Sequence, residues 1–244
     1  ADAAQVFNAL SMGEGLEESR ELMVAPACLR PKILALIDRE IEAARAGEEA
    51  CLGFKLNGLT DKVLIEKFIE ASQAGVKIDL VVRGICCLIG GVHGNTDNIR
   101  VISIVGRYLE HARIYIFGPE ERRQVYISSA DFMTRNTSKR VEVAAPVHDP
   151  VLRAQLEEMF RCELRDTAKG RRQQPDGSYV RMEGEPFNSQ ERFCDEAYRG
   201  AWTVTAPAKP GKKQTGSAEG AEPPEAKTTT RRGLLGRLFG RDQG

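Results

Sequence analysis

The chain has 244 residues, of which 41% are hydrophobic and 29% are charged, and its formal net charge is zero. This composition is enough for one sizeable core, and the balanced charge gives no overall attraction to nucleic acid or anionic membrane. No apolar run approaches the roughly 20 residues that a membrane span needs, and no secretory signal is visible.

The first part of the chain alternates strand and helix patterns. A short strand is predicted over residues 22–26, and apolar residues recur at helical spacing over 31–47. A strand over 50–57, a helix over 61–74 and a nearly continuous apolar strand over 76–82 follow. A strand–helix–strand unit with a short crossover joins parallel strands, so the expected fold class is α/β.

The second part begins with a long glycine-containing loop after Arg83. Further strands are expected over 99–105, 113–117, 124–128 and 140–147, helices over 149–166 and 188–202, and a turn over 174–179. Together these elements predict a mixed sheet flanked by helices.

From Thr203 onward the sequence is rich in Pro, Gly, Ala, Lys and Glu and cannot build a core. The segment RRGLLGRLFGRDQG could place Leu234, Leu235, Leu238 and Phe239 on one helical face, as in a weak membrane or partner contact. Its three glycines oppose a stable helix, so a disordered, solvated tail with a short basic amphipathic end is the preferred interpretation.

The six cysteines contain no C-x-x-C pair, which argues against a zinc site. Scattered cysteines in a domain of ordinary size indicate reduced thiols and hence a cytoplasmic protein. The cysteines are Cys28, Cys51, Cys86, Cys87, Cys162 and Cys194.

Positive charge is concentrated between residues 100 and 140, where eight Lys or Arg residues stand against four Asp or Glu. Lys55, Asn57 and Arg83 lie at the carboxyl ends of predicted strands, where α/β sheets bind ligands. Guanidinium groups suit phosphate oxygens because they donate two parallel hydrogen bonds. This region is therefore a candidate phosphate site, although any single arginine could simply be solvated.

His111 stands where a polar turn becomes the apolar run RIYIF. A histidine, guanidiniums and hydroxyls together supply what phosphoryl transfer requires: charge stabilisation and a group that accepts or relays a proton. Lys55, Arg113 and Ser129 are further candidate phosphate contacts, and each could instead form a salt bridge or turn bond. Two more residues, Asp131 and Arg135, are candidate orienting groups.

Three blocks carry a family resemblance: ASQAGVKIDLVVRGICCL (71–88), DNIRVISIVGRYLEHARIYIF (97–117) and VYISSADFMTRNTSKRVEVAAPV (125–147). They closely resemble the bacterial polyphosphate kinase family, over roughly residues 20–200. The resemblance implies a phospholipase-D-like fold in which two similar lobes each contribute a histidine to a shared site.

The resemblance implies that residues 21–202 are the second, C-terminal catalytic lobe. The chain opens ADAAQVFNALSM without an initiator methionine, so residues 1–20 are interpreted as the remnant of the preceding lobe and 203–244 as the tail. The resemblance also implies reversible transfer of the ATP terminal phosphate to polyphosphate. This transfer would proceed through a phosphohistidine of the missing lobe and would use Mg²⁺. The family's Mg²⁺-associated positions have no match in this chain. The chain is expected to be inactive alone because the lobe with the phosphorylated histidine is missing.

Carried over by position, Arg83 in VRGICC matches an ATP-contacting arginine, and His111 in RYLEH matches the second-lobe histidine that contacts ATP and is implicated in catalysis. The wider superfamily has the pattern H-x-K-x(4)-D, but Arg113 replaces its lysine and Gly118 its aspartate. Residues 128–131, SSAD, replace the usual Gly-Ser-x-Asn. These departures favour the kinase branch over phosphodiesterase chemistry.

The predicted function is thus a polyphosphate kinase catalytic lobe whose partners are ATP, ADP, polyphosphate and the upstream lobe. The complete enzyme is expected to be a homo-oligomer in the cytoplasm, with at most weak, peripheral membrane association through the tail. Two alternatives stay open: a homodimeric phospholipase-D-like phosphodiesterase, and a non-catalytic module that binds polyphosphate or nucleotide.

Overall fold

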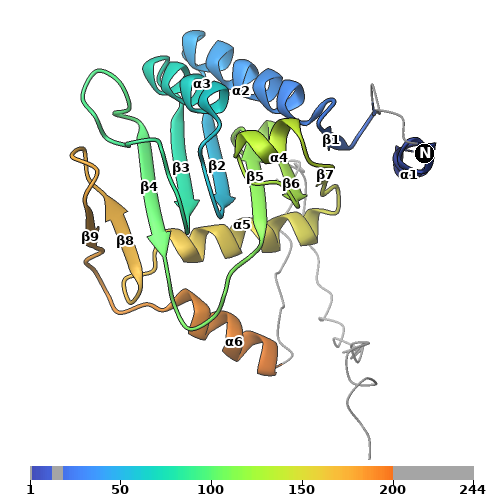
Figure 1. The fold of residues 1–244 in the computed structure, drawn as a ribbon. Coiled ribbons are helices and arrows are strands. Elements are labelled where there is room, and N and C mark those ends of the chain that lie inside the picture. The colour runs from blue at the N-terminus through green and yellow to red at the C-terminus, as the bar shows by residue number, and fades with distance from the viewer. Residues whose placement is uncertain (1, 13–18, 200–244) are drawn as a thin grey trace, which may run out of the picture. The chain divides into compact units, whose positions relative to one another are not determined.

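A computed structural model describes residues 2–12 and 19–199 (Figure 1). The predicted tail from Thr203 onward, with its amphipathic end, lies outside the described residues. The following description concerns the described residues alone.

The described strands form a single nine-stranded mixed sheet in the order β1-β7-β6-β5-β2-β3-β4-β8-β9. Its central strands β2 (Cys51–Leu56), β3 (Lys77–Val82) and β4 (Ile99–Ile104) are parallel, as the strand–helix–strand pattern predicted. The other neighbours are antiparallel. These strands are β1 (Met23–Ala25), β5 (Arg113–Phe117), β6 (Gln124–Ser128), β7 (Glu142–Pro146), β8 (Gly170–Gln173) and β9 (Tyr179–Arg181).

Helices cover both faces of the sheet, which confirms the α/β class. α2 (Leu29–Arg45) and α3 (Lys62–Gln73) pack on one face, side by side in Figure 1, and α5 (Pro150–Leu164) packs on the other. No helix in the described part of the chain is long and apolar enough to cross a membrane. The remaining helices are α1 (Asp2–Met12), the 3₁₀ turn η1 (Glu120–Arg122), α4 (Thr134–Ser138) and α6 (Ser189–Arg199).

Strand β2 shows how alternation divides the core between the two faces. Phe54 points toward α2 and α3, where its ring centroid lies 5.2 Å from that of Phe68 and 5.1 Å from that of Phe132. Gly53 points toward α5, where an added Cβ would come within 2.7 Å of Phe160. The helix therefore packs directly on the strand backbone, and the next residue on this face, Lys55, lies under the same helix.

Two helices begin where local capping chemistry fixes them. The carboxylate of Asp61 accepts hydrogen bonds from the amides of Val63 at 3.0 Å and Leu64 at 3.3 Å, which starts α3. Asp149 caps α5 in the same way, with Pro150 in the first turn. These helix starts agree with the sequence pattern because the capping groups are close in sequence.

The sequence predicted a turn over 174–179 but not the strands on either side of it, β8 and β9. Both are short and polar, with mostly exposed residues such as Arg171 and Arg172. These two strands form one end of the sheet and bury little apolar surface, so their sequences lack the hydrophobic pattern of the central strands. The same weakness of signal hid the five-residue helix α4.

Candidate functional site

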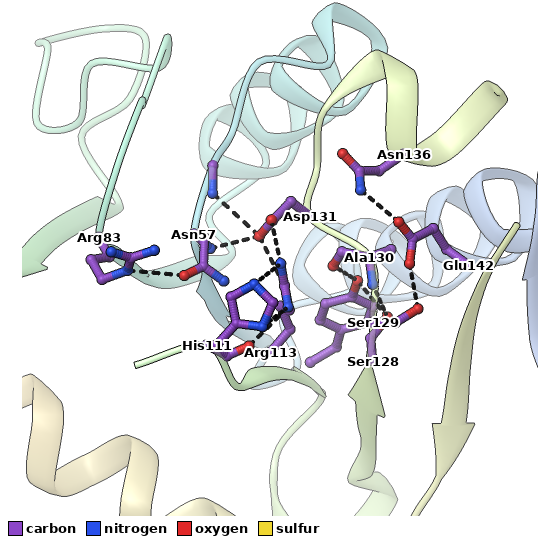
Figure 2. Close-up of polar contacts among 12 residues, drawn as sticks. Asn57, Arg83, His111, Arg113, Ser128, Ser129, Ala130, Asp131, Asn136 and Glu142 are labelled. Carbon is purple, nitrogen blue, oxygen red and sulfur yellow. Dashed lines mark hydrogen bonds and ion pairs between the residues drawn. The ribbon is translucent and has the colours of Figure 1, made fainter. Parts of the chain in front are cut away.

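Segments far apart in the chain end at one edge of the sheet (Figure 2). Asn57 follows β2 and Arg83 follows β3, at the carboxyl ends of two parallel strands. Because β5 runs antiparallel to β2, its first residue, Arg113, and the nearby His111 lie at this edge too. Arg113 pairs with Ser128, the last residue of β6, so the segment 128–131 lies at this edge as well.

His111 is exposed and is held from one side by the buried guanidinium of Arg113. Nη1 of Arg113 lies 3.1 Å from Nδ1 of His111 and donates to the His111 carbonyl at 2.8 Å, while Nη2 lies 3.3 Å from Nε2. Arginine only donates, and a neutral imidazole offers one acceptor nitrogen, so one ring nitrogen at a time can accept from Arg113. The exposed ring is thereby oriented without being covered.

Arg113 is in turn fixed by Asp131. Its Nε donates to Oδ1 of Asp131 at 3.2 Å and its Nη2 to Oδ2 at 2.7 Å, so the pair is bidentate. Oδ1 also accepts from the amides of Asn57 at 2.6 Å and Gly58 at 3.3 Å. Burial opposes ionisation of Asp131, but the Arg113 and amide hydrogen bonds outweigh it and lower the pKa of this carboxyl. The chain Asp131–Arg113–His111 therefore orients the histidine.

Asp131→Asn is expected to lower the free energy of unfolding at pH 7 by about 1.5–3 kcal/mol, because Arg113 loses its buried counter-ion. The folded-state pKa of Asp131 lies below 3.8, so its stabilisation is complete above that value and is lost as the pH falls through the folded pKa. The difference between wild type and variant in urea unfolding should therefore shrink in acid.

The matched control for this measurement is Asp195→Asn, which changes the same charge on the exposed surface of α6. It should alter stability by no more than about 0.5 kcal/mol. Equal effects of the two substitutions would contradict the structural role given to Asp131.

Arg83 presents a partly free guanidinium at this edge. Its Nε donates to Oδ1 of Asn57 at 3.0 Å, and the side chain is half-buried. Its two terminal nitrogens have no hydrogen-bond or ion-pair partner within residues 2–12 and 19–199. One nitrogen thus fixes the side chain, and the charged end stays available for an anion.

The SSAD segment forms its own network beside the arginine and histidine. Ser129 Oγ donates to Oε2 of Glu142 at 2.5 Å, and Asn136 Nδ2 donates to Oε1 of the same carboxylate at 2.7 Å. The hydroxyl of Tyr115 donates to Ser128 at 2.9 Å or to the Ala130 carbonyl at 2.6 Å. These contacts hold the backbone of the segment and turn the Ser129 hydroxyl toward Glu142.

Lys55 lies beneath the loop that carries His111, in a buried cluster with two carboxylates. Its ammonium contacts Oε2 of Glu110 and Oε1 of Glu163, and its side chain is 6% exposed. Gln190 at the start of α6 donates to Oε1 of Glu110 at 2.7 Å and to the carbonyl of Tyr108 at 2.9 Å. The residue before His111 is therefore anchored to β2, α5 and α6.

The pKa values of the two carboxyls in this cluster shift in opposite directions. Burial opposes ionisation of Glu110, but hydrogen bonds from Glu163, Lys55 and Gln190 and the Lys55 charge lower its pKa to about 2. Burial and the neighbouring Glu110 raise the pKa of Glu163 well above its ordinary value. Two carboxyls that share one ammonium oppose each other's ionisation, so their pKa values move apart.

The structure thus brings Arg83, His111 and Arg113 to one edge of the sheet, with Ser129 on the adjacent segment. Lys55 points into the cluster below them. The direct phosphate contacts predicted for Lys55, Arg113 and Ser129 stay predictions, and the contacts described favour positioning roles for all three. The orienting role predicted for Asp131 fits its bond to Arg113, whereas the exposed Arg135 side chain makes no hydrogen bond or ion pair with the described residues.

Residues that the sequence did not single out complete the site. Glu163 lies on the inward face of its helix beside Phe160 and Leu164, and a glutamate among apolar positions was the available signal. Glu110 was visible only as the neighbour of His111. Glu142 gave no signal, because it occupies a strand position like any other polar residue.

No group of three His, Cys, Asp or Glu side chains is placed to hold a metal ion within the described residues. At the sheet edge, Asp131 is engaged by Arg113, and Glu142 by Ser129 and Asn136. The magnesium implied by the family resemblance stays a prediction for the complete enzyme, and these residues give it no ligand set.

Comparison with known protein families gives one match over most of the chain. Residues 22–191 match the model of polyphosphate kinase C-terminal domain 2. The polyphosphate kinase of Thermosynechococcus vestitus is 44% identical over 190 residues, and that of Staphylococcus epidermidis is 45% identical over 200. These alignments cover 78% and 81% of this chain but 26% and 27% of the relatives, so the chain spans about a quarter of their length.

One solved structure agrees with this match. The crystal structure of polyphosphate kinase from Porphyromonas gingivalis superimposes with a TM-score of 0.75 at 36% identity, covering 82% of this chain and 32% of that one. A phospholipase D family member, Nuc from Salmonella typhimurium, matches more weakly, with a TM-score of 0.45 at 15% identity over 66% of this chain.

Proposed function

The chain belongs to the polyphosphate kinase family, as its C-terminal domain 2, and we propose that it supplies half of a phosphoryl-transfer site. The reaction proposed for the complete enzyme is reversible transfer of the terminal phosphate of ATP to inorganic polyphosphate. The observation that carries the proposal is the juxtaposition of an oriented, exposed His111 and the free guanidinium end of Arg83 at one sheet edge. Arg83 would stabilise negative charge, and His111 would contact the transferring group.

In this proposal His111 acts as general acid or base at the phosphoryl group. An imidazole suits this task because it can exchange a proton near neutral pH. Arg113 keeps the ring in place through the contacts described, and its own charge is balanced by Asp131. The proposed role of Arg113 is therefore to position the histidine. Lys55 is proposed to help position it too, because its ion pair with Glu110 holds the residue before His111.

The remaining parts of the reaction are proposed for the complete enzyme. The nucleophilic histidine would come from the other lobe, so this chain alone is expected to bind ATP or polyphosphate weakly and to produce no polyphosphate. All six cysteines are free in the structure, which supports the proposal of a reducing, cytoplasmic location. Homo-oligomerisation is part of the same proposal.

The proposal is tested with a chimera in which residues 22–191 replace the matching segment of the relative from Thermosynechococcus vestitus. Polyphosphate formation from ATP and Mg²⁺ is measured for the chimera, for the intact relative and for the relative with the segment deleted. Activity in the chimera and the intact relative, but not after deletion, is the expected result.

A folded but inactive chimera, combined with ATP binding by the chain alone, would instead favour a non-catalytic binding module. Hydrolysis of a chromogenic phosphodiester by the 244-residue chain would favour the phosphodiesterase alternative. Either result would overturn the proposed function.

A further inference from the structure

Asn57 carries a buried hydrogen-bond donor that is not used by any of the described residues. Its Oδ1 accepts from Arg83 Nε at 3.0 Å, whereas its Nδ2 is buried and has no hydrogen-bond partner among the described residues. Leaving such a donor unsatisfied lowers stability, because its hydrogen bond to water is lost and not replaced. The position therefore needs an explanation beyond packing.

The orientation of this carboxamide is fixed by chemistry. Nε of Arg83 can only donate, so the oxygen of Asn57 must face it and the nitrogen must face away. The backbone is fixed as well, because the Asn57 amide donates to Asp131 and its carbonyl accepts from Gly84 at 2.9 Å. The unpaired donor is consequently held in one direction and cannot satisfy itself by rotating.

The surroundings determine which acceptor would suit it. Figure 2 shows Asn57 between Arg83 on one side and His111 on the other. The neighbouring carboxylate, Asp131, is already bound to Arg113 and to backbone amides. A ligand atom at this point must accept a hydrogen bond and tolerate a guanidinium charge nearby, which selects an anionic oxygen.

We propose that Nδ2 of Asn57 is a direct ligand of a phosphoryl oxygen, placed between the contacts of Arg83 and His111. The inference rests on the proposed function and adds a residue to its binding site. Arg83 would supply charge, and Asn57 would supply a neutral donor that fixes the register of the phosphoryl group. Because Nδ2 is covered in this structure, the atoms that cover it must move when the ligand binds.

Asn57→Asp tests this proposal in the 244-residue chain, because it keeps the shape and the acceptor for Arg83 but replaces the donor with a charged oxygen. The probes are inorganic tripolyphosphate and ATP, titrated by calorimetry. Both should bind about 10- to 100-fold more weakly to the variant. The matched control, Asn95→Asp, makes the same charge change in the exposed loop before β4, at the opposite end of the strands, and should bind like wild type.

A second readout needs no substitution. In wild-type protein the side-chain amide resonances of Asn57 in ¹H–¹⁵N correlation spectra should shift on addition of tripolyphosphate, in parallel with binding. An unchanged Asn57 resonance under saturating tripolyphosphate would overturn the inference even if Asn57→Asp failed to fold.

The outcomes separate this inference from the proposed function. Equal binding by Asn57→Asp and Asn95→Asp, with binding lost in Arg83→Ala, would overturn the role of Asn57 and leave the proposed function standing. If neither ATP nor tripolyphosphate binds, the proposed function fails in this chain. In that case, a shift of the Asn57 resonance on addition of inorganic phosphate would still support an anion site at Asn57. An unchanged Asn57 resonance would overturn the inference.

Discussion

His111→Gln is expected to lower polyphosphate formation by the chimera about 10²- to 10⁴-fold, the range that a positioned general acid or base contributes. Glutamine keeps a polar group that can reach a phosphoryl oxygen, but it cannot take up and release a proton. The loss should therefore appear in kcat more than in KM for ATP, since phosphate contacts through Arg83 remain. Steady-state assays with ATP as the varied substrate measure both constants.

The control is His148→Gln. This histidine is exposed, pairs with Glu21 at 3.1 Å, and follows β7 at the end of the sheet opposite to His111. Its substitution should leave both constants unchanged. Wild-type turnover in the His111→Gln chimera would reduce His111 to an orienting or packing residue and leave Arg83 as the centre of a binding surface.

Lys55→Met is expected to lower the free energy of unfolding by about 3–5 kcal/mol at pH 7, because it leaves the half-buried Glu110 and the buried Glu163 without their ammonium partner. Methionine fills a similar volume, so most of the loss should be electrostatic. Urea unfolding of the 244-residue chain measures it. Lys62→Met removes an exposed lysine of α3 that is 3.6 Å from Glu66, and it should cost less than about 1 kcal/mol.

A second substitution identifies the electrostatic origin. In Lys55→Met/Glu110→Gln the Glu110 charge is removed together with its partner, so much of the lost stability should return relative to the Lys55→Met single variant. If Lys55→Met and Lys62→Met have equal effects, or if Glu110→Gln brings no recovery, the cluster does not stabilise the fold as described.

The same cluster determines the direction in which the stability of the fold changes with pH. The pKa of Glu110 is lowered to about 2, so its stabilisation is complete above the ordinary value of 4.5 and is lost as the pH falls through about 2. Glu163 has a raised pKa, so its contribution is complete below 4.5 and is lost as the pH rises through its folded pKa. Lys55→Met should weaken the first dependence, because the ammonium that favours the Glu110 charge is gone.

The sequence by itself determined most of the central sheet and its covering helices. Apolar spacing located β2, α3 and β3, and the short crossover predicted that the two strands are parallel. These signals are local: hydrophobic period and capping groups act over a few residues. The three quoted blocks also identified the family and selected His111 and Arg83, which are exposed and half-buried at the sheet edge.

Only the tertiary structure decided what each polar side chain does. Lys55 was a reasonable phosphate ligand from its place at a strand end, but its face of β2 lies under α5, where Glu163, 108 residues away, is its partner. Asn57 likewise stood out only in the structure, where Arg83 donates to its Oδ1 and its Nδ2 has no partner among the described residues. The physical reason is that a polar group's partner depends on burial, strand order and register. These bring together residues that are far apart in the chain, so no local pattern encodes the pairing.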